Sequence, residues 1–477
     1  MSEQKQLSIG LSRRAFLKRT ALVGVGLSVL PAWLAACAPA GSAPAAGGSG
    51  APAGSAPVKV TWFVRDDNIV NPWEDKMVAE FSKDHPNIKV EWVSGGQGAE
   101  REAKFSALIA GGTPPDIFSS WQEAGFGDYA ARKLALDLKS FIEKSADLDL
   151  KSIPDALLKT YERNGELLGI PFASGASYLF YNKKLFDAAQ VPYPTTNWDD
   201  ANWTWATFVE TAKKLTKDYG TPNAVYGANV GIWPSNAQAW LFSGDFYPEE
   251  AYTTGFFKES VADTENTIAA YQAQHDLIYK DQVSPSPALN DAMSSVGDPF
   301  KTGHIAMQLT GVWGFWTYSD VKDFEIGAAA FPTGKGSNKP VIFTDPWMIA
   351  RESKHPQEAW EFTKMLVDPK RGGKSYVETT GVIPPAQELL PTWYEKIGGR
   401  MPWIKPDEQK ALIEGSMKKG YESANHLLVG FNEMESMCSS ELQAIFLNKA
   451  SAADTLKGIK TKLDDISSKV RKQFGQA

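Results

Sequence analysis

Residues 58–64 read VKVTWFV and residues 88–93 read IKVEWV, and both stretches are rich in the β-branched and aromatic residues that favour strands. Between them, residues 72–85 place apolar side chains near the 3.6-residue period of a helix. A second helix is expected over residues 100–109, and a third strand starts at residues 116–118. This alternation of strands and helices predicts an α/β fold with parallel strands.

Each of these three strands is followed by a polar or glycine-rich loop, at residues 65–68, 94–98 and 119–123. In open parallel sheets, ligands bind beyond the carboxyl ends of the strands. Because the three loops leave the same edge of the predicted sheet, we expect them to converge. The pattern therefore predicts a ligand site at this edge, built from residues that are far apart in the sequence.

The rest of the chain continues the α/β pattern around a middle part with little periodicity. The further expected elements are an extended stretch over 169–182, helices over 183–189, 203–218 and 355–368, strand-like stretches over 326–331, 341–343 and 347–350, and a helical end over 432–474. Residues 190–320 are rich in aromatic side chains, and their elements are left open. The 420 residues after position 57 exceed what one hydrophobic core holds, so two lobes are expected.

The N-terminus has the order of a bacterial export signal. Residues 12–18 read SRRAFLK, a twin-arginine pattern. The apolar run over residues 21–36 is interrupted by glycine and proline, and it is shorter than the ~20 residues of a permanent membrane helix. The run ends in LAAC, which resembles a lipobox. We therefore expect residues 1–36 to be removed and Cys37 to carry lipid, which would anchor the protein to the outer face of the cytoplasmic membrane, in the periplasm or at the cell surface.

A low-complexity segment follows the expected anchor. Residues 38–57 consist only of Ala, Pro, Gly and Ser. Such a segment buries too little apolar surface to offset the entropy lost on ordering it. We therefore expect residues 37–57 to form the lipidated cysteine and a flexible linker, with a root-mean-square span of roughly 25 Å.

Charge and cysteine content exclude several classes of protein. Without residues 1–36, which hold five Lys or Arg and one Glu, 44 basic and 55 acidic residues remain, a net charge of −11. This balance disfavours nucleic acid and anionic lipid surfaces as partners. With Cys37 lipidated, Cys438 has no disulfide partner in the chain, and we expect it to be a small buried apolar residue. The five histidines are scattered without metal-ligand spacing, so neither a metal nor a cofactor is expected.

Five motifs, in order over some three hundred residues, resemble the extracellular solute-binding proteins of family 1. These are the receptors of ABC importers for sugars and glycerol phosphates, and they include the maltose-binding proteins. The motifs are TPPDI at 113–117, LGIPF at 168–172 with LFYNKKLF at 179–186, FKTGHIAM at 300–307 with GVW at 311–313, FP at 331–332 with Gly334, and GVIP at 381–384. Two positions depart from the family pattern: His304 replaces the usual Lys, and the turn around Gly334 has its first proline changed.

The resemblance implies a two-lobed periplasmic-binding-protein fold, type II-like, with the ligand in a cleft between lobes joined by hinge crossings. Lobe one would hold residues 58–172 and 327–380. Lobe two would hold residues 173–326 and 381–477. The permease and its ATPase would be separate chains, and the binding protein itself a monomer.

Recognition of a sugar needs aromatic planes for its C–H faces and polar groups for its hydroxyls. The 16 tryptophans supply planes in excess, although most are expected to fill the core. The candidate ligand-binding residues are chosen by their position in the motifs and loops. They are Asp66, Asp67, Gln97, Trp121, Gln122, Glu123, Ser174, Tyr178, Trp233, Trp313, Asp345 and Trp347. Trp313 lies where the family has a stacking tryptophan, and Asp66 or Asp67 where relatives direct a carboxylate to sugar hydroxyls.

The function implied is capture of a sugar, a di- or oligosaccharide, for an ABC importer, without catalysis. Three alternatives stay open: an exported carbohydrate-active enzyme, a receptor for ligands of the glycerol phosphate type, and a sensor that passes its closed form to a signalling partner. Adjacent carboxylates such as Asp199 and Asp200 do not by themselves make the facing pair that glycoside hydrolysis needs.

Overall fold

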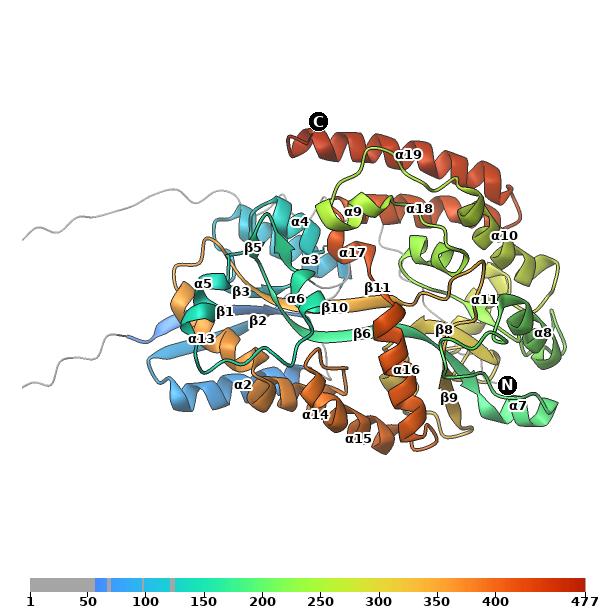
Figure 1. The fold of residues 1–477 in the computed structure, drawn as a ribbon, viewed down its shortest axis with the longest axis horizontal. Helices are drawn as coiled ribbons and strands as arrows, with labels where there is room; N and C mark the ends of the chain where they lie inside the picture. The colour runs from blue at the N-terminus through green and yellow to red at the C-terminus, as the bar shows by residue number, and fades with distance from the viewer. Residues whose placement is uncertain (1–55, 67–69, 97, 121–124, 477) are drawn as a thin grey trace, which may run out of the picture. The chain divides into compact units, whose positions relative to one another are not determined.

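A nine-stranded mixed β-sheet organises the described part of the chain (Figure 1). The computed structural model describes residues 56–66, 70–96, 98–120 and 125–476. Seven strands lie in the order β2-β1-β3-β10-β6-β8-β7, while β11 pairs with β10 and β9 pairs with β6. The strands of this sheet are β1 (Val58–Val64), β2 (Ile88–Ser94), β3 (Ile117–Ser119), β6 (Ile170–Asn182), β7 (Asn229–Val230), β8 (Met307–Gly311), β9 (Ile326–Ala329), β10 (Val341–Ile349) and β11 (Tyr421–Glu422). A small hairpin adds β4 (Glu162–Arg163) and β5 (Glu166–Leu167).

The helices before β8 come from both the predicted and the open parts of the chain. They are α2 (Asn71–Asp84), α3 (Gly98–Ala110), α4 (Phe126–Ala131), α5 (Lys139–Lys144), α6 (Asp155–Lys159), α7 (Lys183–Ala189), α8 (Trp205–Leu215), the 3-10 helix η1 (Ser235–Phe242), α9 (Glu249–Thr254), α10 (Glu265–Tyr279) and α11 (Pro287–Ser294).

The later helices make up most of the C-terminal third. They are α12 (Gly314–Thr317), α13 (Pro356–Val367), the π-helix η2 (Pro369–Gly373), α14 (Lys374–Thr380), the 3-10 helix η3 (Gln387–Leu389), α15 (Leu390–Arg400), α16 (Pro406–Lys419), α17 (Ala424–Leu427), α18 (Phe431–Phe446) and α19 (Ala452–Gln473).

The predicted order of the first strands and helices is confirmed. β1 pairs in parallel with both β2 and β3, as the strand–helix alternation indicates. The sheet as a whole is mixed, however, because β10 runs antiparallel to β3 and to β6. The predicted stretches at 341–343 and 347–350 belong to one strand, β10, which runs from Val341 to Ile349.

Two of the predicted helices differ from those observed. The expected helix over 203–218 is limited to α8, because Thr204 caps its start and Thr216 is already extended. The helical end over 432–474 is divided into α18 and α19. Asn448 adopts a left-handed φ of 54° in the break, and the Ser451 side chain accepts the backbone N–H of Asp454 at the start of α19.

Two long strands, β6 and β10, link the two ends of the sheet. β6 pairs with β10 through Ile170–Ala176 and with β8 and β9 through Ser177–Asn182. A buried aromatic cluster packs at one end, where Trp62 meets Trp347 edge-on at 5.2 Å between ring centroids. At the other end, Phe180 packs edge-on against Phe315 at 5.2 Å. Apolar packing at both ends of the sheet therefore fixes the position of β6 and β10, the two crossing strands beside which the site is built.

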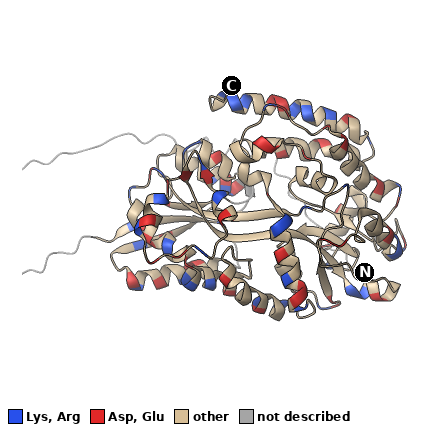
Figure 2. Cartoon of the chain, in the orientation of Figure 1, with Lys and Arg blue, Asp and Glu red and all other residues tan. Residues whose placement is uncertain are grey.

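On the exposed faces of the helices, charged residues of both signs are interspersed (Figure 2). Lys and Arg alternate with Asp and Glu along α16 and α19 (Figure 2). Within the residues that the structure describes, no helix is long and apolar enough to span a membrane.

Candidate functional site

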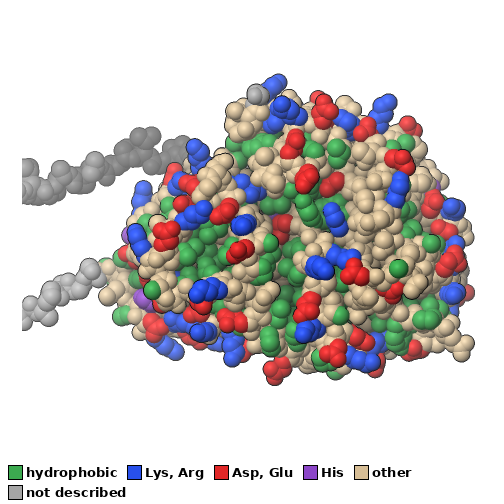
Figure 3. All heavy atoms as spheres, in the orientation of Figure 1, with side chains coloured by type: hydrophobic (Ala, Val, Ile, Leu, Met, Phe, Trp, Pro, Cys, Tyr) green, Lys and Arg blue, Asp and Glu red, His purple; other side chains and the backbone are tan. Residues whose placement is uncertain are grey.

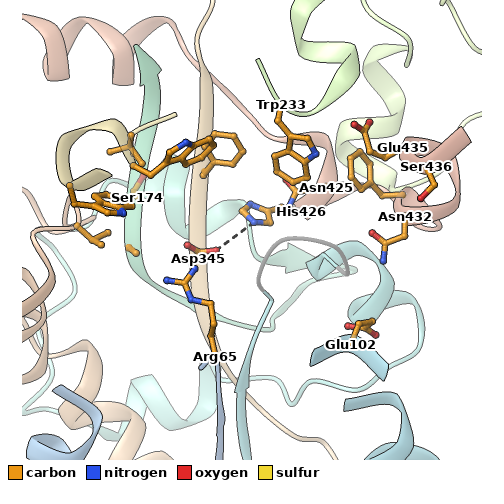
Figure 4. Close-up of a pocket in the computed structure, with 18 of the residues that line it drawn as sticks. Arg65, Glu102, Ser174, Trp233, Asp345, Asn425, His426, Asn432, Glu435 and Ser436 are labelled. Carbon is orange, nitrogen blue, oxygen red and sulfur yellow. Dashed lines mark ion pairs between the residues drawn. The ribbon is translucent and has the colours of Figure 1, made fainter. Parts of the chain in front are cut away.

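A cavity of about 780 Å³ opens beside the crossing strands, and we call it the aromatic cavity. Its walls come from α3, β6, β10, α12, α14, α17 and α18, together with the segments that follow β1, β7, β8 and α14 (Figure 4). The lining residues are Arg65, Glu102, Ala103, Ser106, Ala173, Ser174, Gly175, Trp233, Val312, Trp313, Trp316, Phe343, Asp345, Tyr376, Val382, Asn425, His426, Phe431, Asn432, Glu435 and Ser436.

Four aromatic side chains form a continuous wall of this cavity. The Trp233 ring lies nearly parallel to that of Phe343, with centroids 5.8 Å apart and an interplanar angle of 15°. Trp313 packs against the same phenylalanine at 5.3 Å, and Phe431 meets Trp233 edge-on at 6.2 Å. Trp233 and Trp313 are only partly buried, so faces of these rings remain available to a ligand. Such planes suit the C–H faces of a sugar ring.

Two glycines make room for this wall. A Cβ atom on Gly311, the last residue of β8, would lie 2.2 Å from the Trp313 ring. On the neighbouring strand β6, a Cβ on Gly175 would lie 2.7 Å from Val312 Cγ2. Both contacts are closer than real side chains allow, so the chain can fold Trp313 back over the end of β8 only because residue 311 has no side chain.

The polar floor of the cavity is built on β10. Successive side chains of a strand point to opposite faces, so Phe343 and Asp345 both face the cavity. The Asp345 Oδ1 lies 3.6 Å from His426 Nε2, and the Arg65 side chain points toward the same carboxyl group (Figure 4). Burial raises the pKa of Asp345 to about 6, although the positive charges of His426 and Arg65 act to lower it.

Two further carboxyl groups lie at the other end of the cavity, near Asn432 (Figure 4). Glu102 accepts a hydrogen bond of 2.9 Å from the Tyr129 hydroxyl. Glu435 accepts hydrogen bonds from the backbone N–H and the hydroxyl of Ser235, at 3.1 and 2.7 Å. Burial raises the pKa of both glutamates. The cavity therefore offers several hydrogen-bond acceptors to hydroxyl groups, with Arg65 and His426 as its basic residues.

Four of the residues selected from the sequence are brought together in this cavity: Ser174, Trp233, Trp313 and Asp345. Asp66 lies at its edge, where the exposed carboxylate accepts a hydrogen bond of 3.0 Å from Asn71 Nδ2, and it is not among the lining residues. The other loop residues of the prediction, Asp67, Gln97, Trp121, Gln122 and Glu123, lie outside the described residues, as does Cys37.

The remaining two candidates lie in the core and do not line the aromatic cavity. Tyr178 is fully buried, and its hydroxyl hydrogen-bonds to Ser416 Oγ at 2.9 Å. Trp347 is 2% exposed. The register between β6 and β10 shifts between Asp345 and Pro346, and the Phe172 ring stacks on Trp347 at 4.3 Å, which covers it. Phe172 is the residue of β6 that the shift leaves unpaired, and because its ring covers Trp347, this candidate does not line the aromatic cavity.

Several lining residues were not selected from the sequence. Phe343 belongs to a predicted strand, where alternation with Asp345 was a usable signal. His426, Asn432 and Glu435 come from the C-terminal part of the chain, and no spacing rule connects them with β1 or β10. Within the described ranges, no group of three or more His, Cys, Asp or Glu side chains is arranged to hold a metal ion.

The comparisons with known proteins agree with this architecture. The family model described as bacterial extracellular solute-binding protein matches residues 66–371. An arabinooligosaccharide-binding protein of Bacillus subtilis (strain 168) is 24% identical over 322 residues, 65% of this chain and 69% of that protein. A solved ABC substrate-binding protein of Listeria monocytogenes, in complex with cycloalternan, is similar with a TM-score of 0.70 and 21% identity, over 88% of this chain and 100% of that chain.

UgpB from Mycobacterium tuberculosis, solved in complex with glycerophosphocholine, has a TM-score of 0.68 at 18% identity, over 87% of this chain and 99% of that chain. These similarities establish the predicted two-lobed α/β fold of substrate-binding proteins. Because the family model covers well over half of its residues, this chain belongs to the bacterial extracellular solute-binding proteins.

Proposed function

We propose that this chain is the substrate-binding lipoprotein of an ABC importer and that it captures an uncharged di- or oligosaccharide in the aromatic cavity. The observation that carries the proposal is the combination of the Trp233–Phe343–Trp313 wall with the acceptors Asp345, Glu102 and Glu435. Flat rings fit the faces of a sugar, and carboxylates accept hydrogen bonds from its hydroxyls. The similarity to an arabinooligosaccharide-binding protein supports the same class of ligand.

Capture would work by closure of the two lobes around the ligand. A ligand that touches residues from β1, β10 and α18 at once binds the closed form more tightly and shifts the population toward it. Moving the equilibrium from 1:99 to 99:1 takes about 5.5 kcal/mol of differential affinity. In this proposal lobe one is 58–172 with 327–380, lobe two is 173–326 with 381–477, and Cys37 is the lipid anchor. The closed, monomeric protein then delivers the sugar to a separate permease.

A receptor for ligands of the glycerol phosphate type is the second candidate, favoured by the similarity to a glycerophosphocholine complex. The lining charges argue against it. Three carboxyl groups face the cavity, and the basic residues Arg65 and His426 both lie near Asp345 rather than at the Glu102 and Glu435 end. A phosphate group would meet like charges in a partly desolvated space.

The test is a thermal-unfolding screen of the purified full-length chain with lactose, maltose, arabinotriose, glycerol 3-phosphate and glucose 6-phosphate. We expect one or more of the neutral sugars to raise the melting temperature, because a ligand at 100 times its Kd adds about 2.7 kcal/mol of stability. Stabilisation by the phosphates alone would replace the sugar proposal with the second candidate. Chromatography of the sugars after incubation should return them unchanged, and cleavage would identify an enzyme.

A further inference from the structure

A row of three side chains, with the buried His426 between the partly buried Glu422 and Asp345, crosses β10 beside the aromatic cavity. Glu422 Oε1 lies 2.6 Å from His426 Nδ1, and His426 Nε2 lies 3.6 Å from Asp345 Oδ1. The His426 ring is 2% exposed. The same Glu422 oxygen accepts the backbone N–H of Thr344 at 3.1 Å. One carboxyl group therefore holds both the imidazole and the strand residue next to Asp345.

The two ends of this row face different cavities. Asp345 and His426 line the aromatic cavity, whereas Glu422 lines a second cavity of about 1390 Å³ that we call the rear cavity. β10 separates them, since Phe343 faces the aromatic cavity and its neighbour Ile342 faces the rear cavity. The rear cavity lies between α6 and α16, where apolar side chains gather around a hollow in Figure 3. Glu422 pairs directly with Ile342 in the sheet.

We propose that Glu422, which does not line the aromatic cavity, is a positioning residue that holds His426 with its Nδ1–H bond fixed and its Nε2 directed at Asp345. Asp345 then meets the ligand as one member of an imidazolium–carboxylate pair. Glu422 would thus act through His426 and never touch the sugar itself. This inference rests on the proposed function only where it predicts an effect on sugar affinity, because the geometry of the three residues belongs to the free protein.

The electrostatics of the row agree with this role. Burial acts to lower the pKa of His426, but the hydrogen bond and charge of Glu422, with a further contribution from Asp345, outweigh burial and raise it. The charged and titratable groups that face this network from the packed elements are Arg65 after β1, Arg101 on α3, Asp345 on β10, Glu422 on β11 and Tyr161 before β4. Among them, Glu422 is the only one within hydrogen-bond distance of the imidazole in the part of the chain that the structure describes.

The substitution Glu422→Gln separates this role from simple packing. A carboxamide keeps an oxygen for the Thr344 N–H but loses the negative charge. Burial then dominates at His426, whose pKa falls. Asp345 loses the charge of His426, which is the largest influence lowering its pKa and outweighs the smaller repulsion by Glu422, so the pKa of Asp345 rises above about 6. The matched control is Glu414→Gln. Glu414 lines the same rear cavity, but its exposed carboxylate pairs with Lys410 and has no contact with His426.

The first measurement is an NMR titration of full-length protein labelled at histidine Cε1, with the His426 signal assigned from a His426→Gln variant. We expect Glu422→Gln to lower the His426 pKa by about one unit or more, and Glu414→Gln to leave it unchanged. An unaltered His426 pKa in a folded Glu422→Gln variant would overturn the proposal. This readout needs no ligand, so it remains decisive if no sugar binds.

The second measurement is calorimetric binding of whichever of lactose, maltose or arabinotriose stabilises the wild-type chain, between pH 5.5 and 8.5. Wild-type affinity should fall as pH drops through about 6, where Asp345 takes up a proton. In Glu422→Gln the same loss should occur at higher pH. In the His426→Gln background, Glu422→Gln removes only the direct repulsion between the two carboxyl groups, so there it should lower the midpoint rather than raise it. The proposal that Glu422 acts through the imidazole would be refuted by either of two results. One is a pH midpoint of sugar affinity in Glu422→Gln that equals the wild-type midpoint. The other is an equal upward move of this midpoint when Glu422→Gln is added to His426→Gln.

Discussion

The substitution Gly311→Ala is expected to displace the Trp313 ring without disturbing β8. The backbone φ of Gly311 lies outside the left-handed region, so alanine fits the strand conformation. Its Cβ would, however, lie 2.2 Å from both Cη2 and Cζ3 of Trp313. Ordinary contacts begin at about 3.5 Å, so the ring has to move by about 1 Å. Because the aromatic cavity lies next to the ring, the ring can turn into that space.

The losses of stability and of sugar affinity depend on how the Trp313 ring relieves this overlap. Overpacking a filled core costs about 1–3 kcal/mol, and a ring that can turn into a cavity should cost near the lower limit. Trp313→Ala removes the plane altogether. Burial of a large apolar side chain contributes about 1.5–3 kcal/mol, so the Kd for a stacked sugar should rise roughly tenfold to a hundredfold. Gly311→Ala should raise the Kd about tenfold, since the plane is tilted rather than lost.

A double-mutant cycle provides the assay. Melting temperature and sugar Kd are measured for the wild type, Gly311→Ala, Trp313→Ala and the double variant. In the Trp313→Ala background the three atoms nearest the added methyl group are absent, so Gly311→Ala should there change neither quantity. If Gly311→Ala changes the melting temperature and the sugar Kd equally in both backgrounds, its contact with the Trp313 ring is not the cause of those changes. A sugar affinity within twofold of wild type in Trp313→Ala would remove Trp313 from the site.

Two further predictions concern residues outside the ligand contacts. Asp128 is partly buried, and burial raises its pKa to about 6, so its ionised form is disfavoured in the folded state. Stability should therefore fall as pH rises from about 4 to about 6. Asp128→Asn keeps an oxygen for the Gly430 N–H. It should therefore raise the free energy of unfolding at pH 7.5 by about 2–3 kcal/mol and remove the dependence of stability on pH between 4 and 6. A variant that is less stable than wild type at pH 7.5 would contradict the reasoning. Tyr178→Phe deletes a buried hydroxyl bonded to Ser416 and should cost about 1 kcal/mol while sugar affinity stays at the wild-type value; a weakened affinity would return Tyr178 to the binding site.

Local patterns in the sequence predicted the elements that position half of the cavity. The alternation over 58–118 located β1, α2, β2, α3 and β3 to within two residues of their observed bounds. Trp313 was selected because its motif resembles that of the family, and it lies two residues after the end of β8. Such features depend on neighbours in the chain, so they are visible without knowledge of the tertiary contacts.

The remainder of the site depends on contacts that no local pattern specifies. Beside the register shift at Asp345, Phe172 covers Trp347, and the sequence TDPW contains no signal that predicts this shift. His426 and Glu435 enter the cavity because α17 and α18 pack near the crossing strands, some eighty residues after β10. The break between α18 and α19 was readable, however, because Asn448 favours a left-handed φ and Ser451 is a good helix cap.

The ionisation of Asp345 gives the two ligand classes opposite dependences on pH. A neutral sugar donates a hydroxyl hydrogen bond to the charged carboxylate, so its affinity falls when Asp345 takes up a proton near pH 6. A phosphate is repelled by the same charge. Two unit charges 4 Å apart interact by about 4 kcal/mol at an effective dielectric constant of 20, so protonation of Asp345 would favour a phosphorylated ligand. The raised pKa values of Glu102 and Glu435 add to the effect in the same direction. The sign of the change in affinity between pH 7.5 and pH 5.5 therefore separates the two classes even when their absolute affinities are similar.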